Sequence, residues 1–134
     1  MDAGVFLKQY KKNASLIENK KKDRQRWEEI SMNIVSQMGG ERVQSSGSKE
    51  KMANAVVEAV EVDREIQSCK NAMKKVLKVI EELEVREYEF AYKHYIEYMT
   101  LGEIANQEGK SSTWAGNMNK KVKASVQEIL DRRG

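Results

Sequence analysis

The chain of 134 residues contains no proline and only 8 glycines, so few points along it oppose a regular helix. A single cysteine, Cys69, excludes a disulfide within the chain and falls among apolar helical positions, which indicates a core thiol. No apolar run approaches the roughly 20 residues of a membrane span, and the first residues lack the apolar region of a signal peptide. We therefore expect an all-α, cytoplasmic protein without a membrane segment.

Neither sign of charge dominates, because 24 basic residues face 21 acidic ones. The distribution is uneven, however. Between residues 110 and 123 there are four lysines and no acid, whereas five glutamates crowd residues 81–89. A local basic patch of this kind suits a polyanionic partner better than the net charge of +3 does.

The first two thirds of the chain carry apolar residues at helical spacing in two long stretches, residues 5–38 and 52–83. In the first stretch the pattern consists of Phe6, Tyr10, Ala14, Ile17, Trp27, Ile30, Ile34 and Met38, and in the second it includes Met52, Ala55, Val56, Ala59, Val60, Ile66, Cys69, Met73, Val76 and Ile80. Between them, residues 39–51 are rich in glycine and serine and predict a connection, in which Ser46 or Ser48 caps the next helix. We expect a long antiparallel helical hairpin over residues 1–82 that serves interaction or dimerisation.

Two alternatives stay open for this half. Each apolar stripe is narrow and the opposite faces are charged, so the helices could instead pair between chains as a coiled coil. The basic run at residues 20–26 could act as an arm on the DNA backbone, although a lysine-rich helix face is more often simply solvated.

The last third, residues 83–134, has shorter spacings and more aromatic residues. One predicted helix, which ends near Met99, packs an inward face formed by Tyr88, Ala91, Tyr92, Tyr95 and Ile96. Thr100 followed by Glu103 predicts a capping box and hence the start of another helix. Gly109 lies four residues after the small Ala105, where it can end that helix and turn the chain.

Ser111 can cap one more helix, over residues 112–123, whose inward residues by angle are Ala115, Met118 and Val122. Its opposite face is polar at the N-terminal end and cationic toward the C-terminal end. Two helices joined by a tight turn, the second with such a face, favour a helix-turn-helix that reads double-stranded DNA. The predicted DNA-binding residues are Lys110, Ser111, Ser112, Thr113, Gly116, Asn117, Lys120, Lys121 and Lys123.

Three further residues bear on this interpretation. Asn117 is the candidate for base reading, because its amide matches N6 and N7 of adenine. Trp114 could stack on sugar-phosphate, dock on the N-terminal helices or fill core, and docking is favoured slightly. His94 stands without a nearby Cys or second His, so a metal role is not expected. With no nucleophile-base pair or phosphate loop in sight, we expect neither an enzyme nor a cofactor.

The segment Leu83–Val122 resembles region 4 of bacterial sigma factors, in the residues Tyr95, Thr100, Leu101, Glu103, Ile104, Ala105, Gly109 and Ser111. The chain as a whole is similar to the phage and prophage ArpU and RinA late transcription regulators, including a "V-x-x-S" connection at Val43–Ser46. This resemblance implies phage gene control in a bacterial host, with activation of late or packaging genes. Family recognition helices carry arginines and an aliphatic residue where this chain has Trp114 and Ala115, so the base preference is not carried over.

The leading hypothesis is therefore a sequence-specific DNA-binding transcription regulator, with RNA polymerase and a second copy of the chain as further partners to be tested. A small terminase-like DNA recognition subunit, which would assemble as a ring, is one alternative. A helical protein-protein interaction module without DNA binding is the other, motivated by the small net charge and the acidic residues 81–89.

Overall fold

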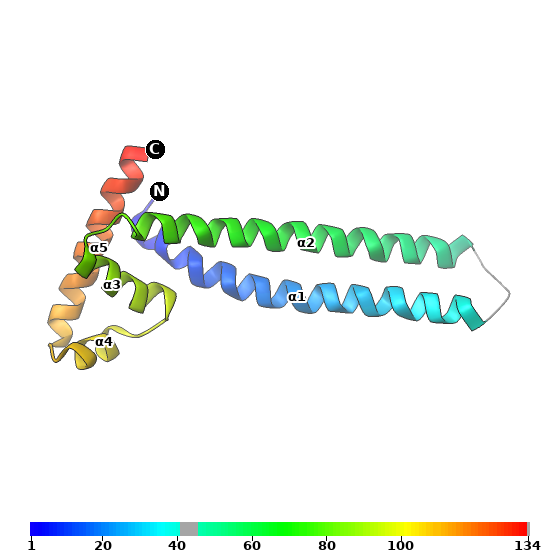
Figure 1. Ribbon diagram of the computed structural model, residues 1–134, viewed down its shortest axis with the longest axis horizontal. Helices are drawn as coiled ribbons and strands as arrows, with labels where there is room; N and C mark the ends of the chain where they lie inside the picture. The colour runs from blue at the N-terminus through cyan, green and yellow to red at the C-terminus, as the bar shows by residue number, and fades with distance from the viewer. Residues whose placement is uncertain (41–45, 134) are drawn as a thin grey trace. The chain divides into compact units, whose positions relative to one another are not determined.

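The computed structural model describes residues 1–40 and 46–133, and this part of the chain is helical without a strand (Figure 1). In chain order the elements are α1 (Ala3–Gly40), α2 (Ser46–Ile80), α3 (Val85–Ala91), the π-helical turn η1 (Tyr92–Ile96), α4 (Leu101–Glu108) and α5 (Ser112–Arg133). The predicted all-α class with two long N-terminal helices is confirmed. None of the described helices combines the length and the apolarity that crossing a lipid bilayer requires.

The connection between α1 and α2 is shorter than predicted, because α2 already begins at Ser46. Residues 46–51 are thus helical, as a chain without proline allows. Val43 of the proposed connection, the side chains of Ile34 and Met38, and the capping roles of Ser46 and Ser48 all lie outside the described residues.

The chain forms two compact units that divide it differently from the predicted boundary at residue 82. One unit combines Met1–Ala14 with Asn71–Gly134, and the other comprises Ser15–Lys70. Both long helices contribute to both units. The start of α1 and the end of α2 therefore belong to the same unit as the C-terminal helices.

In the unit Ser15–Lys70, α1 and α2 run antiparallel and side by side (Figure 1). Lys20 Nζ lies 2.6 Å from Glu65 Oε2, and Arg24 Nε lies 2.5 Å from Asp63 Oδ1, so rising numbers on α1 meet falling numbers on α2. The apolar layer between these helices includes Ile17, Ala55, Val62, Ile66 and Cys69, all buried. Cys69 is a core thiol, as expected.

These ion pairs bear on the basic run at residues 20–26. Lys20 and Arg24 are engaged by acids of α2, Arg26 pairs with Asp23, and Lys21 lies 3.9 Å from Glu18. Because exposed pairs are weak, they stabilise the hairpin only slightly. They do neutralise most of the run, which favours the solvated-face interpretation over a DNA-binding arm.

Two residues of α2 depart from the expected packing face. Val56 and Val60 were placed on the same face as Ala55 and Ile66, yet they are 48% and 46% exposed. At 100° per residue, Val56 and Val60 lie about 90° and 130° from the mean direction in which Ala55 and Ile66 point. Two separate apolar stripes of α2 were therefore predicted as one, because residues of both stripes are linked by steps of 3 and 4 residues.

In the unit of Met1–Ala14 with Asn71–Gly134, one core draws on every helix. Its largest fully buried side chains are Leu7, Val76, Ile80, Ile104, Val122 and Val126. The start of α1 is also tied to α5 by hydrogen bonds: the Ala3 amide donates to Gln127 Oε1 at 2.9 Å, and Gln127 Nε2 donates to the Met1 carbonyl at 3.0 Å. Without the N-terminal turns of α1, the C-terminal half of α5 would lose part of its apolar cover.

We predict that Leu7→Ala destabilises this unit by about 2–5 kcal/mol, because Leu7 is fully buried and truncation leaves a cavity. Denaturant unfolding followed by the fluorescence of Trp114, with Trp27 replaced by Phe, measures this loss. The matched control is Val5→Ala, which truncates a 57% exposed side chain of the same helix and should change stability by less than about 0.5 kcal/mol. Equal effects of the two substitutions would contradict the shared core.

Candidate nucleic-acid interface

The helix α4 begins at the predicted capping box. Thr100 Oγ1 accepts a hydrogen bond from the Glu103 amide at 3.1 Å, and the Thr100 amide donates to Glu103 Oε1 at 3.2 Å. Two amides that lack helical partners are thereby satisfied. The prediction of a helix start at this point is confirmed.

The segment before α4 differs from the single helix that was predicted to end near Met99. The helix α3 ends at Ala91 and continues as the wider π-helical turn η1, after which Tyr98 adopts a left-handed φ of 63°. The chain closes this end with a hydrogen bond from the Met99 amide to the Lys93 carbonyl at 2.9 Å. His94 Nδ1 lies 2.7 Å from the Met99 carbonyl, so this ring is used in the same turn.

The corner between α4 and α5 follows the predicted chemistry. Gly109 takes φ 66° and ψ 34°, a left-handed conformation that glycine adopts without a Cβ clash. The Lys110 amide then donates to the Ala105 carbonyl at 2.8 Å. Ser111 Oγ accepts from the Trp114 amide at 3.1 Å, which makes Ser111 the N-terminal cap of α5.

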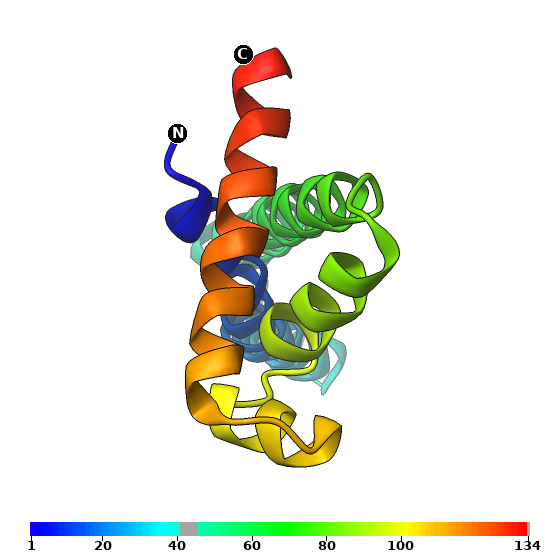
Figure 2. The same ribbon diagram turned by 90° about the vertical axis from the view of Figure 1, so that its left-hand side faces the viewer.

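The two helices that flank this corner pack through small side chains. Ala105 on α4 and Ala115 on α5 are both buried, at 4% and 0% exposed. Figure 2 shows α4 beside the N-terminal end of α5, with the rest of α5 running past α3 toward the C-terminus. The close fit fixes which face of α5 points inward at its N-terminal end.

The opposite face of α5 is polar and exposed, as the helical angles predicted. Seven of the nine predicted DNA-binding residues are exposed, namely Lys110, Ser111, Ser112, Thr113, Asn117, Lys120 and Lys121. Gly116 and Lys123 are half-buried. Among the described residues, no acid forms an ion pair with Lys110, Lys120 or Lys121, so their charges remain available to a polyanion.

Lys123 differs from the other lysines of the predicted patch. Its Cε lies 3.7 Å from the position that a Cβ on Gly4 would occupy, so the side chain rests against the first turn of α1. The helix α5 is also longer than the predicted 112–123 and runs to Arg133, because Val126 and Ile129 continue its buried stripe. The exposed cationic part of the face therefore ends at Lys121.

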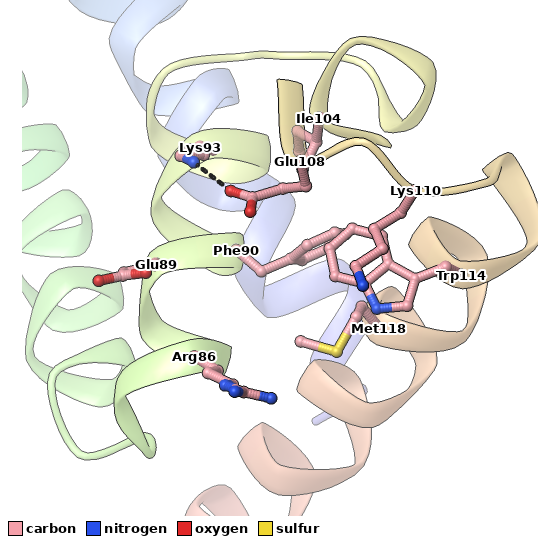
Figure 3. Close-up of a pocket in the computed structure, with 9 residues that line it drawn as sticks. All are labelled: Arg86, Glu89, Phe90, Lys93, Ile104, Glu108, Lys110, Trp114 and Met118. Atoms are coloured by element: carbon pink, nitrogen blue, oxygen red, sulfur yellow. Dashed lines mark hydrogen bonds and ion pairs between the residues drawn. The ribbon is translucent and has the colours of Figure 1, made fainter. Parts of the chain in front are cut away.

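Trp114 packs on α3 rather than on the N-terminal helices, where docking had been favoured. Its ring meets Phe90 edge to face, with centroids 6.0 Å apart. Together with Ile104 and Met118 these rings form the apolar wall of a cavity of about 310 Å³ (Figure 3). The rim carries the Lys93–Glu108 ion pair, 2.9 Å between Nζ and Oε1.

A part-buried hydrogen bond joins α5 to η1, and the helical spacing of the sequence alone does not predict it. Tyr95 donates its hydroxyl proton to Asn119 Oδ1 at 2.5 Å, which fixes the rotation of α5. Burial raises the pKa of Tyr95 to about 12, with the Asn119 hydrogen bond acting in the opposite direction. Asn119 is thus structural, whereas Asn117, two residues before it, points to solvent.

The raised pKa of Tyr95 predicts a pH-dependent contribution to stability. The unfolded phenol titrates near 10 and the folded one near 12, so above pH 10 the unfolded state releases a proton that the folded state keeps. The stabilisation that comes from this difference in pKa is fully present below pH 10. Between pH 10 and about 12 the free energy of unfolding falls by up to about 1.4 kcal/mol for each pH unit. The stability advantage of the native chain over Tyr95→Phe should therefore shrink between pH 9 and 11 in urea unfolding. A constant difference across that range would contradict the assignment.

Gly116 offers a second test of this region, since a Cβ added there would meet nothing within 4 Å. Alanine should stabilise α5 by about 0.5–1 kcal/mol, because glycine costs backbone entropy in a helix. The matched substitution Gly109→Ala should instead destabilise by about 1 kcal/mol, since its φ of 66° suits glycine. Thermal unfolding of both variants measures the opposite signs, and a loss of stability in Gly116→Ala would contradict the open geometry.

Comparisons of the chain with protein-family models, with curated proteins and with solved structures find no match. The described residues contain no group of three or more His, Cys, Asp or Glu placed to hold a metal ion.

Proposed function

We propose that the chain is a phage or prophage DNA-binding transcription regulator in which α4 and α5 form a helix-turn-helix. The observation that carries this proposal is the exposed face of the N-terminal half of α5. Short polar side chains at its start are followed within three turns by the unpaired Lys120 and Lys121. A face of this kind fits the major groove, with base edges at the N-terminal end and phosphates beside the lysines.

The start of α5 supplies a phosphate site in this proposal. Ser111 Oγ already accepts the Trp114 amide, and the Ala115 amide makes the first helical bond. The amides of Ser112 and Thr113 are left without a partner inside the helix, as the first positions of any helix are. They can donate to a DNA phosphate at the positive end of the helix dipole, with the exposed Lys110 beside them.

Base reading falls to Asn117, one helical turn beyond Thr113. Its side chain is exposed, and the neighbouring Asn119 is already engaged with Tyr95, so only Asn117 offers an uncommitted amide on this face. A carboxamide pairs in two-pronged fashion with N6 and N7 of adenine. Gly116 lets the groove approach the backbone beside it.

The biological role follows from the resemblance alone. Similarity to the ArpU and RinA regulators supports control of late or packaging genes in a bacterial host, with RNA polymerase as a further partner. In this proposal the chain acts through binding and needs neither a catalytic group nor a cofactor.

Selection of random duplex DNA by the purified protein near 150 mM salt tests the proposal directly. We expect enrichment of one motif, and a pair of half-sites about one helical turn apart if two copies bind together. A folded, helical protein that enriches no motif would contradict sequence-specific binding on its own.

Single substitutions test the assigned roles. Asn117→Ala should weaken binding to the selected site by about 1–3 kcal/mol and relax preference at one base pair. Lys120→Ala should weaken all duplexes alike and lower the slope of log affinity against log salt by about 1. Fluorescence anisotropy with selected and scrambled duplexes measures both effects.

Matched controls for these variants lie elsewhere on the chain. Asn19→Ala and Lys22→Ala remove exposed side chains of the same types from α1, and both should bind like the native protein. Unchanged binding by Asn117→Ala would remove it from the base-reading role, and an equal loss in Lys22→Ala would extend the interface to the basic run.

A further inference from the structure

The helix α2 carries two apolar stripes on opposite sides within the unit Ser15–Lys70. One stripe, which includes Ala55, Val62 and Ile66, is buried against α1. The other consists of Ala53, Val56, Val57 and Val60 and is exposed; its three valines are 48%, 57% and 46% exposed. At 100° per residue, the two stripes point about 150° apart.

The exposed stripe has the spacing of a helix-packing face. Its members fall at positions i, i+3, i+4 and i+7, which is the pattern by which a helix buries itself against another helix. The only other described helix in this unit, α1, already occupies the opposite side. The stripe, named here the valine stripe, thus lacks a helix to pack against within the single chain.

We propose that the valine stripe binds a second copy of this chain, with the two α2 helices antiparallel about a two-fold axis between Val56 and Val57. This inference does not depend on DNA binding. In such a pair Val56 meets Val57 of the partner helix, and Ala53 meets Val60. The stripe is its own complement because its four members are symmetric about that midpoint.

The charges at the two ends of the stripe support the antiparallel arrangement. Glu50 lies just before the stripe and Arg64 just after it, and both are exposed. Antiparallel pairing about the same midpoint brings Glu50 of one copy to within one residue, about 1.5 Å, of the level of Arg64 of the other, twice in the dimer. Arg64 also forms an exposed ion pair with Glu61 of its own helix, which is weak enough for the partner's Glu50 to share. In parallel pairing each residue would meet its own kind, so the opposite charges would lie at different ends.

The stripe is short compared with the roughly 800 Å² per partner of a standard interface, so the dimer should be concentration-dependent. Sedimentation velocity between about 1 µM and 1 mM should show the mass rising from 15.4 kDa toward twice that value. A monomer throughout this range would overturn the proposal. A closed ring would overturn it too, because an isologous contact ends at two copies.

A matched pair of variants tests the surface. Val57→Glu should raise the dimer dissociation constant at least about tenfold, since it places a carboxylate in the centre of the interface. Val5→Glu makes the same change on α1 at a side chain that is also 57% exposed, and it should leave association unchanged. Circular dichroism confirms folding of each variant. Equal dissociation constants for the two variants would overturn the proposal.

Cysteine cross-linking tests the orientation, in a Cys69→Ala background because Cys69 is the only native thiol. Ala53→Cys and Val60→Cys lie at opposite ends of the stripe, about 10 Å apart along the helix. Antiparallel pairing predicts a disulfide when the two variants are mixed and little when each is oxidised alone. The reverse result would show a parallel pair and overturn the proposed arrangement.

Discussion

The position of α5 depends on the core that it shares with the start of α1 and the end of α2. Leu7, Ile80 and Val122 are all fully buried in this core, although they lie far apart in the sequence. Because one side of α5 is held by apolar contacts from its first turn to Ile129, its opposite side is fixed toward solvent. The proposed DNA-reading face is a consequence of this packing, since the polar residues of α5 lie wherever the core does not.

Local chemistry was predictable wherever a few neighbouring residues decide the outcome. The capping box at Thr100, the left-handed Gly109 and the Ser111 cap each involve side chain and backbone within four residues, so the sequence contains the whole interaction. The outward direction of Asn117 and Lys120 likewise follows from the helical repeat and the buried Ala115 and Val122.

The structure differed from expectation where distant residues decide the outcome. The two units divide the chain at residues 14 and 70 because the N-terminal turns of α1 pack on α5, a contact across more than 100 residues. Asn119 becomes a hydrogen-bond partner inside the fold only because Tyr95 reaches it from η1. Val56 and Val60 were assigned to the buried face of α2 for another reason. Residues on either side of a helix can be linked by steps of 3 and 4 residues, so only the angle of each residue around the helix axis tells the buried face from the exposed one.

The valine stripe and the exposed face of α5 lie in different units and would bind their partners through different interactions. The valine stripe gains from the removal of apolar area from water, which salt scarcely weakens, whereas Lys120 and Lys121 act through counterion release, which salt weakens strongly. A dimer that presents two α5 faces converts the second DNA contact into an intramolecular step, provided that both half-sites can be reached together. Weak self-association and weak single-site binding would then reinforce each other. Occupancy of a paired site would rise more steeply with protein concentration than occupancy of a lone half-site.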